Sequence, residues 1–127
     1  MGKRILIVDD EPNIVVSLEF LMKREGFEVD VATNGEAALK AVDERAPDLV
    51  LLDIMLPSIN GFELCQKLRA DPRWRGLKII MLTAKGRESD MAKGLGLGAD
   101  LYVTKPFSTK ELVAQVKQLL AAGISSA

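Results

Sequence analysis

The segment Asp48-Leu49-Val50-Leu51-Leu52-Asp53-Ile54-Met55-Leu56-Pro57 is an almost unbroken apolar run that holds one internal carboxylate, Asp53. Such a run is typical of a strand buried on both faces, as in a parallel sheet with helices on either side. Asp53 then lies at the carboxyl end of the strand, the edge where ligands bind in open α/β sheets. This aspartate is a candidate for chemistry, or it serves only to hydrogen-bond the following loop.

The rest of the chain alternates strands and helices. Further strands are predicted at 3–8, 27–32, 77–82 and 101–104. Helices are predicted to begin after Asp10, Asn34, Asn60 and Phe107, and the fourth of five helices is expected at roughly 88–97. An aspartate is expected to cap the helix that starts at Pro12. Right-handed crossovers assemble such units into an α/β fold, a doubly wound five-stranded parallel sheet with helices on both faces.

The length, composition and net charge of the chain restrict the classes of function. A length of 127 residues predicts one domain, with its core at about 3–121 and a short tail at 122–127. No apolar run is long enough to span a membrane and the N-terminus lacks a signal peptide, so we expect a cytoplasmic protein without membrane contact. The absence of histidine excludes His-based metal sites and nucleophile pairs. A net charge of −1 provides no overall attraction for nucleic acid.

Five polar residues follow the predicted strands and should meet at one edge of the sheet: Asp9, Asp10, Asp53, Thr83 and Lys105. Carboxylates gathered at one edge repel each other, and oxygen ligands without histidine favour Mg²⁺ as the neutralising cation. Phosphoryl transfer to a carboxylate requires a cation, a fixed positive charge and a hydroxyl or amide around the phosphoryl group. Lys105 would supply the charge, Thr83 the hydroxyl, and Asp53 the acceptor.

At this point the sequence resembles a family, the receiver domains of two-component response regulators, of the kind found in chemotaxis regulators. The resemblance runs from about residue 3 to 120. It rests on Val-Asp-Asp-Glu at 8–11, Leu-Leu-Asp-Ile-Met-Leu-Pro at 51–57, Asn-Gly at 60–61, Leu-Thr-Ala at 82–84, Gly-Ala-Asp at 98–100 and Tyr-Val-Thr-Lys-Pro-Phe at 102–107. It implies a flavodoxin-like fold with strand order 2-1-3-4-5.

The resemblance also implies a role for each site residue. Asp53 is similar to the aspartate that accepts a phosphoryl group. Mg²⁺ would be bound by Asp10, Asp53 and the backbone carbonyl of Met55, with Asp9 acting through water. Lys105 resembles the lysine that pairs with a phosphoryl oxygen. Thr83 resembles the switch hydroxyl that moves toward the phosphoryl group, and Tyr102 resembles the aromatic residue that turns inward when this happens.

The partners implied are a sensor histidine kinase or a phosphotransfer protein, and an output domain or a downstream protein. The output would be controlled through a face formed by the fourth helix, fifth strand and fifth helix, which also forms homodimers in many relatives. Met91, Leu101 and Gln115 stand where those relatives often carry charges, so an apolar docking patch is an alternative to a salt-bridged dimer. A free-standing receiver and a domain of a longer regulator or hybrid kinase both remain open.

Other classes of function fit less well. An aspartyl phosphatase would need its nucleophile after the first strand in an Asp-x-Asp pattern, and a flavin or nucleotide site would need a phosphate-binding loop there. We therefore expect a signalling domain that catalyses only its own phosphorylation and dephosphorylation. A basic cluster with one aromatic residue could contact nucleic acid, but it is more typical of a solvated loop: Arg69, Arg73, Trp74, Arg75 and Lys78.

Overall fold

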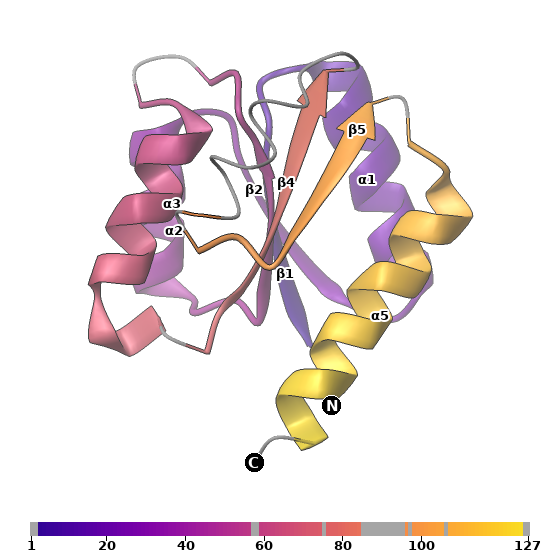
Figure 1. The fold of residues 1–127 in the computed structure, drawn as a ribbon. Coiled ribbons are helices and arrows are strands. Elements are labelled where there is room, and N and C mark those ends of the chain that lie inside the picture. Colours follow the sequence, from indigo (N-terminus) through magenta and orange to yellow (C-terminus); the bar gives the residue numbers. More distant parts are fainter. Residues whose placement is uncertain are drawn as a thin grey trace.

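The computed structural model describes residues 3–56, 59–74, 76–84, 96, 98–105 and 107–125. Its five strands form one parallel sheet in the order β2-β1-β3-β4-β5 (Figure 1), which confirms the predicted architecture. The strands are β1 (Arg4–Val8), β2 (Glu28–Ala32), β3 (Leu49–Asp53), β4 (Lys78–Ala84) and β5 (Leu101–Lys105). The described helices are α1 (Pro12–Arg24), α2 (Gly35–Glu44), α3 (Gly61–Ala70) and α5 (Thr109–Ser125), with a 3₁₀ turn, η1 (Pro72–Trp74).

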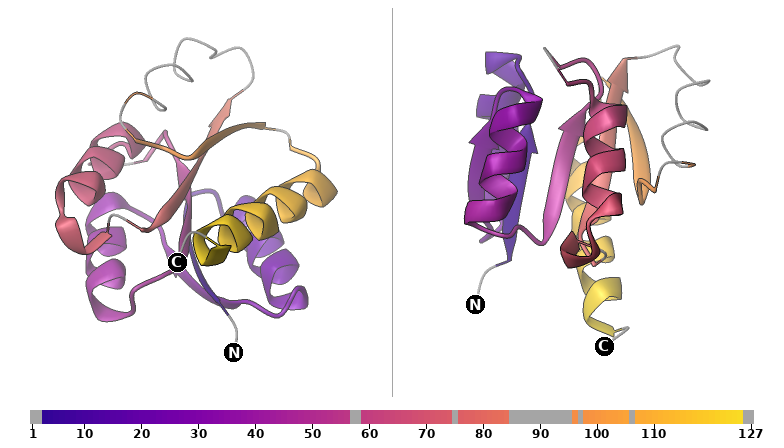
Figure 2. Two further views of the ribbon diagram at one scale, coloured as in Figure 1. Left: turned by 60° about the horizontal axis from the view of Figure 1, so that its bottom comes forward. Right: turned by 90° about the vertical axis from the view of Figure 1, so that its left-hand side faces the viewer.

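Helices cover both faces of the sheet, as Figures 1 and 2 show. The alternation of side chains along each strand divides the core into two layers. In β3, Val50 and Leu52 pack toward α2 and α3, whereas Leu49 and Leu51 pack toward α1 and α5. All five residues of β3 are buried, because this strand lies at the centre of the sheet and is covered on both faces. The apolar run of the sequence therefore marks the middle of the molecule.

Local signals in the sequence explain where the helices begin. Asn34 and Asn60 each accept a hydrogen bond from the amide three residues later and cap α2 and α3. At the start of α5, Ser108 accepts a bond from the amide of Glu111, also three residues later.

The expected aspartate cap of α1 is wrong. Glu11 occupies the N-cap position, and its side chain makes no capping hydrogen bond. The chain turns sharply after β1, so the carboxylate of Asp9 accepts the amide of Glu11 at 2.9 Å and stabilises that turn instead of the helix.

Two predictions for the second half of the chain can be set beside the structure. The predicted fourth helix at 88–97 lies almost entirely outside the described residues. Helix α5 continues to Ser125, beyond the expected core boundary at residue 121.

In the part of the chain that the structure describes, none of the helices has the length and apolar character that crossing a bilayer requires.

Candidate functional site

Three aspartates meet where β1 and β3 end. Val8 of β1 is paired with Leu52 of β3, so the residues that follow each of them, Asp9 and Asp53, are neighbours across the two strands. With Asp10 they form the acid group, in which one carboxylate oxygen from each residue lies within 4.8 Å of the others. Asp9 and Asp53 are buried and Asp10 is exposed. The structure thus brings together the three acids predicted from the sequence.

The loop after β3 is held close to the acid group. Asp53 Oδ1 accepts the amide of Met55 at 3.1 Å, and the carbonyl oxygen of Ile54 accepts the amide of Gly61 at 2.8 Å. A Cβ atom on Gly61 would lie 2.7 Å from the carbonyl oxygen of Asp53. Asp53 therefore stabilises the following turn, one of the two roles considered from the sequence, and it uses Oδ1 for this bond while Oδ2 faces Lys105.

Lys105 reaches the acid group from the end of β5. Its Nζ atom donates to Asp9 Oδ2 and to Glu11 Oε1, both at 3.1 Å, and lies 3.5 Å from Asp53 Oδ2. The side chain is 16% exposed, so this ammonium is largely shielded from water. One positive charge is therefore shared among three carboxylates.

These surroundings change how easily Asp53 ionises. Burial is the largest cause that raises the pKa of Asp53, to about 6 from an ordinary value of 3.8, and the negative charges of Asp9 and Asp10 raise it further. The Met55 amide and the Lys105 ammonium act in the opposite direction. Near pH 7 the carboxylate is mostly ionised, although its charge is destabilised by the protein around it.

The surroundings also raise the pKa of Lys105, which favours its charged form. Burial alone would lower the pKa of Lys105, but the hydrogen bonds to Asp9 and Glu11 and the charges of Asp53 and Asp9 raise it overall. Lys105 is therefore a fixed positive charge under all ordinary conditions.

Thr83 and Tyr102 lie on neighbouring strands and share a face of the sheet. Met81 is paired with Tyr102 in the β4–β5 register, and Thr83 follows Met81 by two residues, which places its side chain on the same face. Thr83 is 4% exposed and Tyr102 is 9% exposed. Tyr102 belongs to the core layer that includes Ile79 and Met81. Thr83 stands one residue beyond Leu82, the strand partner of Asp53.

The structure also assigns contacts that sequence reasoning missed. The sequence predicts no role for Glu11, yet its carboxylate contacts Lys105, 94 residues away. The sequence predicts a solvated loop around Arg69, yet the guanidinium of this residue donates to four acceptors: the carbonyl oxygens of Gly98, Trp74 and Leu77 and the carboxylate of Asp100. No sequence signal indicates where such long side chains point.

A second member of that basic cluster is also held by internal contacts. Arg73 binds Asp71 at 2.7 Å and Asp43 at 3.0 Å, and its guanidinium lies 4.9 Å from the ring centre of Trp74. Trp74 packs partly against the core, in agreement with the loop interpretation. Both arginines therefore use their donors on the protein itself.

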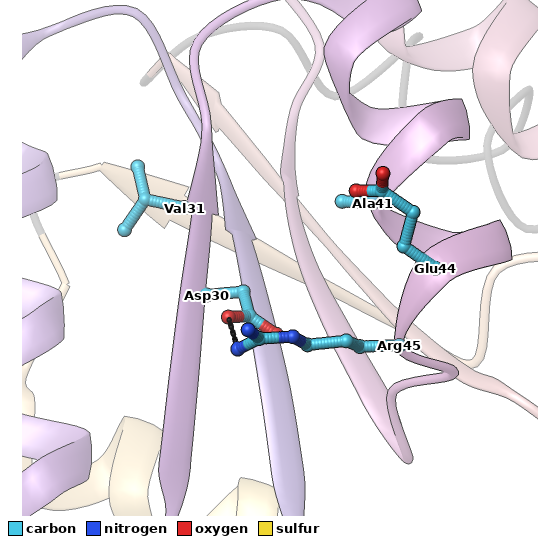
Figure 3. Close-up of a pocket in the computed structure, with 5 residues that line it drawn as sticks. All are labelled: Asp30, Val31, Ala41, Glu44 and Arg45. Carbon is cyan, nitrogen blue, oxygen red and sulfur yellow. Dashed lines mark hydrogen bonds and ion pairs between the residues drawn. The ribbon is translucent and has the colours of Figure 1, made fainter.

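A hollow of about 280 Å³ lies between β2 and α2, away from the acid group. Its lining includes Asp30 on β2 and Arg45 after α2, which form an ion pair of 3.4 Å across it (Figure 3). None of the residues that line this hollow is one of the predicted site residues, so it adds nothing to the site at the carboxyl ends of the strands.

The acid group has the ligands that a hard divalent cation prefers. All three side chains offer carboxylate oxygens, two of them from buried residues, and the chain contains no histidine that would favour a softer metal. The residues present therefore fit Mg²⁺, and they are poor ligands for zinc or copper.

Comparisons with known proteins agree with this geometry. The family model described as "Response regulator receiver domain" matches residues 5–117. The phosphate regulon transcriptional regulatory protein PhoB of Rhizobium meliloti is 50% identical over 120 residues, which cover 94% of this chain and 53% of PhoB. The DNA-binding response regulator MtrA of Mycolicibacterium smegmatis is 51% identical over 120 residues, which cover 94% of this chain and 51% of MtrA.

The chain thus spans about half the length of the curated relatives it matches. A solved structure of a CheY-like response regulator receiver domain protein from Methanospirillum hungatei superimposes with a TM-score of 0.93 at 32% identity, and all of each chain is covered. From the family match, the identity to these regulators and the shared fold, we conclude that this chain belongs to the response regulator receiver domain family of two-component systems.

Proposed function

We propose that this domain accepts a phosphoryl group on Asp53 from a phosphohistidine of a sensor histidine kinase or of a phosphotransfer protein. The observation that carries the proposal is the position of Asp53, which is buried at the end of β3 with Lys105 Nζ 3.5 Å away and two further acids within 4.8 Å. Such partners act in the cytoplasm, which is the location we propose for the domain.

The proposed reaction is a direct transfer between two side chains. A carboxylate oxygen of Asp53 attacks the phosphorus atom and forms a P–O bond. The P–N bond of the phosphohistidine breaks, and the histidine nitrogen keeps its electron pair. The ionised form of Asp53 is the reactive one, and a pKa of about 6 makes this form the major one near pH 7. In dephosphorylation, water attacks the same phosphorus atom, the P–O bond to Asp53 breaks, and inorganic phosphate and the free carboxylate of Asp53 are released.

Mg²⁺ bound at this site would offset negative charge on the phosphoryl oxygens. We propose Asp10, Asp53 and the backbone carbonyl of Met55 as its ligands, with Asp9 acting through water. Lys105 is proposed to pair with a phosphoryl oxygen, a role that its permanent positive charge suits. The hydroxyl of Thr83 is proposed to donate to another oxygen of the same group.

We propose that Thr83 and Tyr102 connect this chemistry to the output. Since both side chains lie on one face of adjacent strands, a shift of Thr83 toward Asp53 changes the packing next to Tyr102. The phosphorylated state then favours a second arrangement of the face that includes β5 and α5. This face would control an output domain or a partner protein, in keeping with the transcriptional regulators among the relatives, or would bind a second copy of the chain.

The test is intact-mass analysis after incubation with acetyl phosphate, with and without Mg²⁺. A gain of one phosphoryl group that requires Mg²⁺ and is absent in Asp53→Asn supports the proposal. An equal gain in Asp53→Asn, or no gain in the wild type with Mg²⁺ bound, contradicts it.

A further inference from the structure

We infer that Glu11 is a positioning residue that holds Lys105 away from the phosphoacceptor, and so limits the rate at which Asp53 is phosphorylated. The inference rests on the proposed function. Lys105 Nζ is closer to Glu11 Oε1, at 3.1 Å, than to Asp53 Oδ2, at 3.5 Å. Two of the three N–H donors of the ammonium are directed to Asp9 and Glu11, so a move of Nζ toward a phosphoryl group on Asp53 lengthens the hydrogen bond to Glu11 or to Asp9.

Two acids, Asp9 and Glu11, compete with Asp53 for this ammonium, and they differ in burial and in whether they belong to the acid group. Asp9 is completely buried and belongs to the acid group that would bind the cation. Glu11 is 60% exposed at its side chain and is not one of the three acids in that group. The charge of Glu11 therefore remains available to Lys105 when Asp9 is engaged by a cation.

A purely structural role for the Glu11 carboxylate is not supported by its contacts. The residue occupies the N-cap position of α1, where a side chain usually accepts a bond from an amide of the first turn, but Glu11 makes no such bond. Its carboxylate instead accepts from Lys105 across 94 residues of sequence. Replacing Glu11 by Gln should therefore leave the helix start intact and weaken the hold on Lys105.

The expected effect is moderate, because the Glu11 carboxylate is exposed and water weakens its ion pair with Lys105. Glu11→Gln should raise the rate constant of phosphorylation by acetyl phosphate about two- to fivefold at constant Mg²⁺ concentration, the range that corresponds to an exposed pair. Glu63→Gln is the matched control. Glu63 is an exposed acid in the first turn of α3, at the same edge of the sheet, so it loses the same charge without touching Lys105.

A double-mutant cycle separates a contact with Lys105 from a general effect of charge on an anionic donor. In a Lys105→Met background, Glu11→Gln should change the rate constant by a factor of about one, since the partner is absent. An independent measurement uses metal-free, unphosphorylated protein labelled with ¹⁵N-lysine. The ammonium signal of Lys105 should shift in Glu11→Gln and stay in place in Glu63→Gln.

The outcomes distinguish this inference from the proposed function. Absence of a phosphoryl gain in the wild type would refute the proposed function, whereas the ammonium signal would still report the contact. A wild type that is phosphorylated while Glu11→Gln reacts at the same rate or more slowly overturns the inference. An equal acceleration in Glu63→Gln, or one that persists without Lys105, also overturns it.

Discussion

Replacing Asp53 by Asn should stabilise the metal-free protein near neutral pH. Burial and the adjacent acids raise the pKa of Asp53 from 3.8 to about 6 in the folded state. Each pKa unit is worth about 1.4 kcal/mol, so the ionised carboxylate lowers the free energy of unfolding by about 3 kcal/mol. Asn keeps the shape of the side chain and its acceptor for the Met55 amide, but it carries no charge.

The effect has a defined pH dependence. Between pH 3.8 and about 6 the folded state of the wild type retains a proton on Asp53 that the unfolded state has lost, so stability falls as the pH rises through this range and then levels off. The Asn variant lacks this contribution. The difference in unfolding free energy between variant and wild type should therefore be close to zero below pH 3.8 and reach about 3 kcal/mol above pH 7.

Urea unfolding at a series of pH values, in the presence of a metal chelator, measures this difference. Glu36→Gln is a suitable control, since Glu36 is an exposed acid in the first turn of α2. Its loss removes a favourable interaction with the helix dipole and should lower stability by about 0.3–1 kcal/mol, the opposite sign. The reasoning is refuted if Asp53→Asn is no more stable than the wild type at pH 7, or if its advantage is the same at pH 4.

Three further predictions concern the loop, the basic cluster and the cation. Gly61→Ala should cost about 1–3 kcal/mol in urea unfolding, because its Cβ would meet main-chain atoms at 2.6 Å, whereas Gly76→Ala, with open space around it, should be nearly neutral. Arg69→Lys should lower the free energy of unfolding by about 2 kcal/mol, because Lys cannot replace the hydrogen bonds of the guanidinium to Gly98, Leu77 and Asp100. Arg73→Lys, at an exposed position, should have a clearly smaller effect in the same urea unfolding measurement. Addition of Mg²⁺ should raise the melting temperature of the wild type by more than that of Asp10→Asn; equal shifts in a calorimeter would contradict the assigned ligand.

Much of the fold and site follows from the order of the strands in the sequence. The apolar run that ends at Asp53 marks the central strand, and the carboxyl ends of parallel strands necessarily meet at one edge. Asp9, Thr83 and Lys105 could be placed at that edge because each lies at the last residue of a strand or one residue from it. The capping role of short polar residues such as Asn60 can also be predicted from the sequence, since their side chains bond amides only a few residues away.

The parts that could not be predicted depend on long side chains. Glu11 and Arg69 can each extend in several directions, and only the packed structure determines which carbonyl or ammonium group they contact. The expected aspartate cap of α1 failed for a different reason: Glu11 occupies the N-cap position, and the carboxylate of Asp9 accepts the amide of Glu11 in the turn after β1. The order of elements thus predicts which main-chain ends meet, and the contacts among their side chains require the three-dimensional arrangement.

The central claim is that Asp53, rather than another acid at this edge, is the phosphoacceptor. The most direct measurement is reductive trapping of the protein treated with acetyl phosphate and Mg²⁺, in which borohydride converts an aspartyl phosphate to homoserine, followed by peptide mass mapping. The account predicts conversion at Asp53 and none at Asp9 or Asp10. Conversion at either of the latter, with Asp53 unchanged, would contradict it.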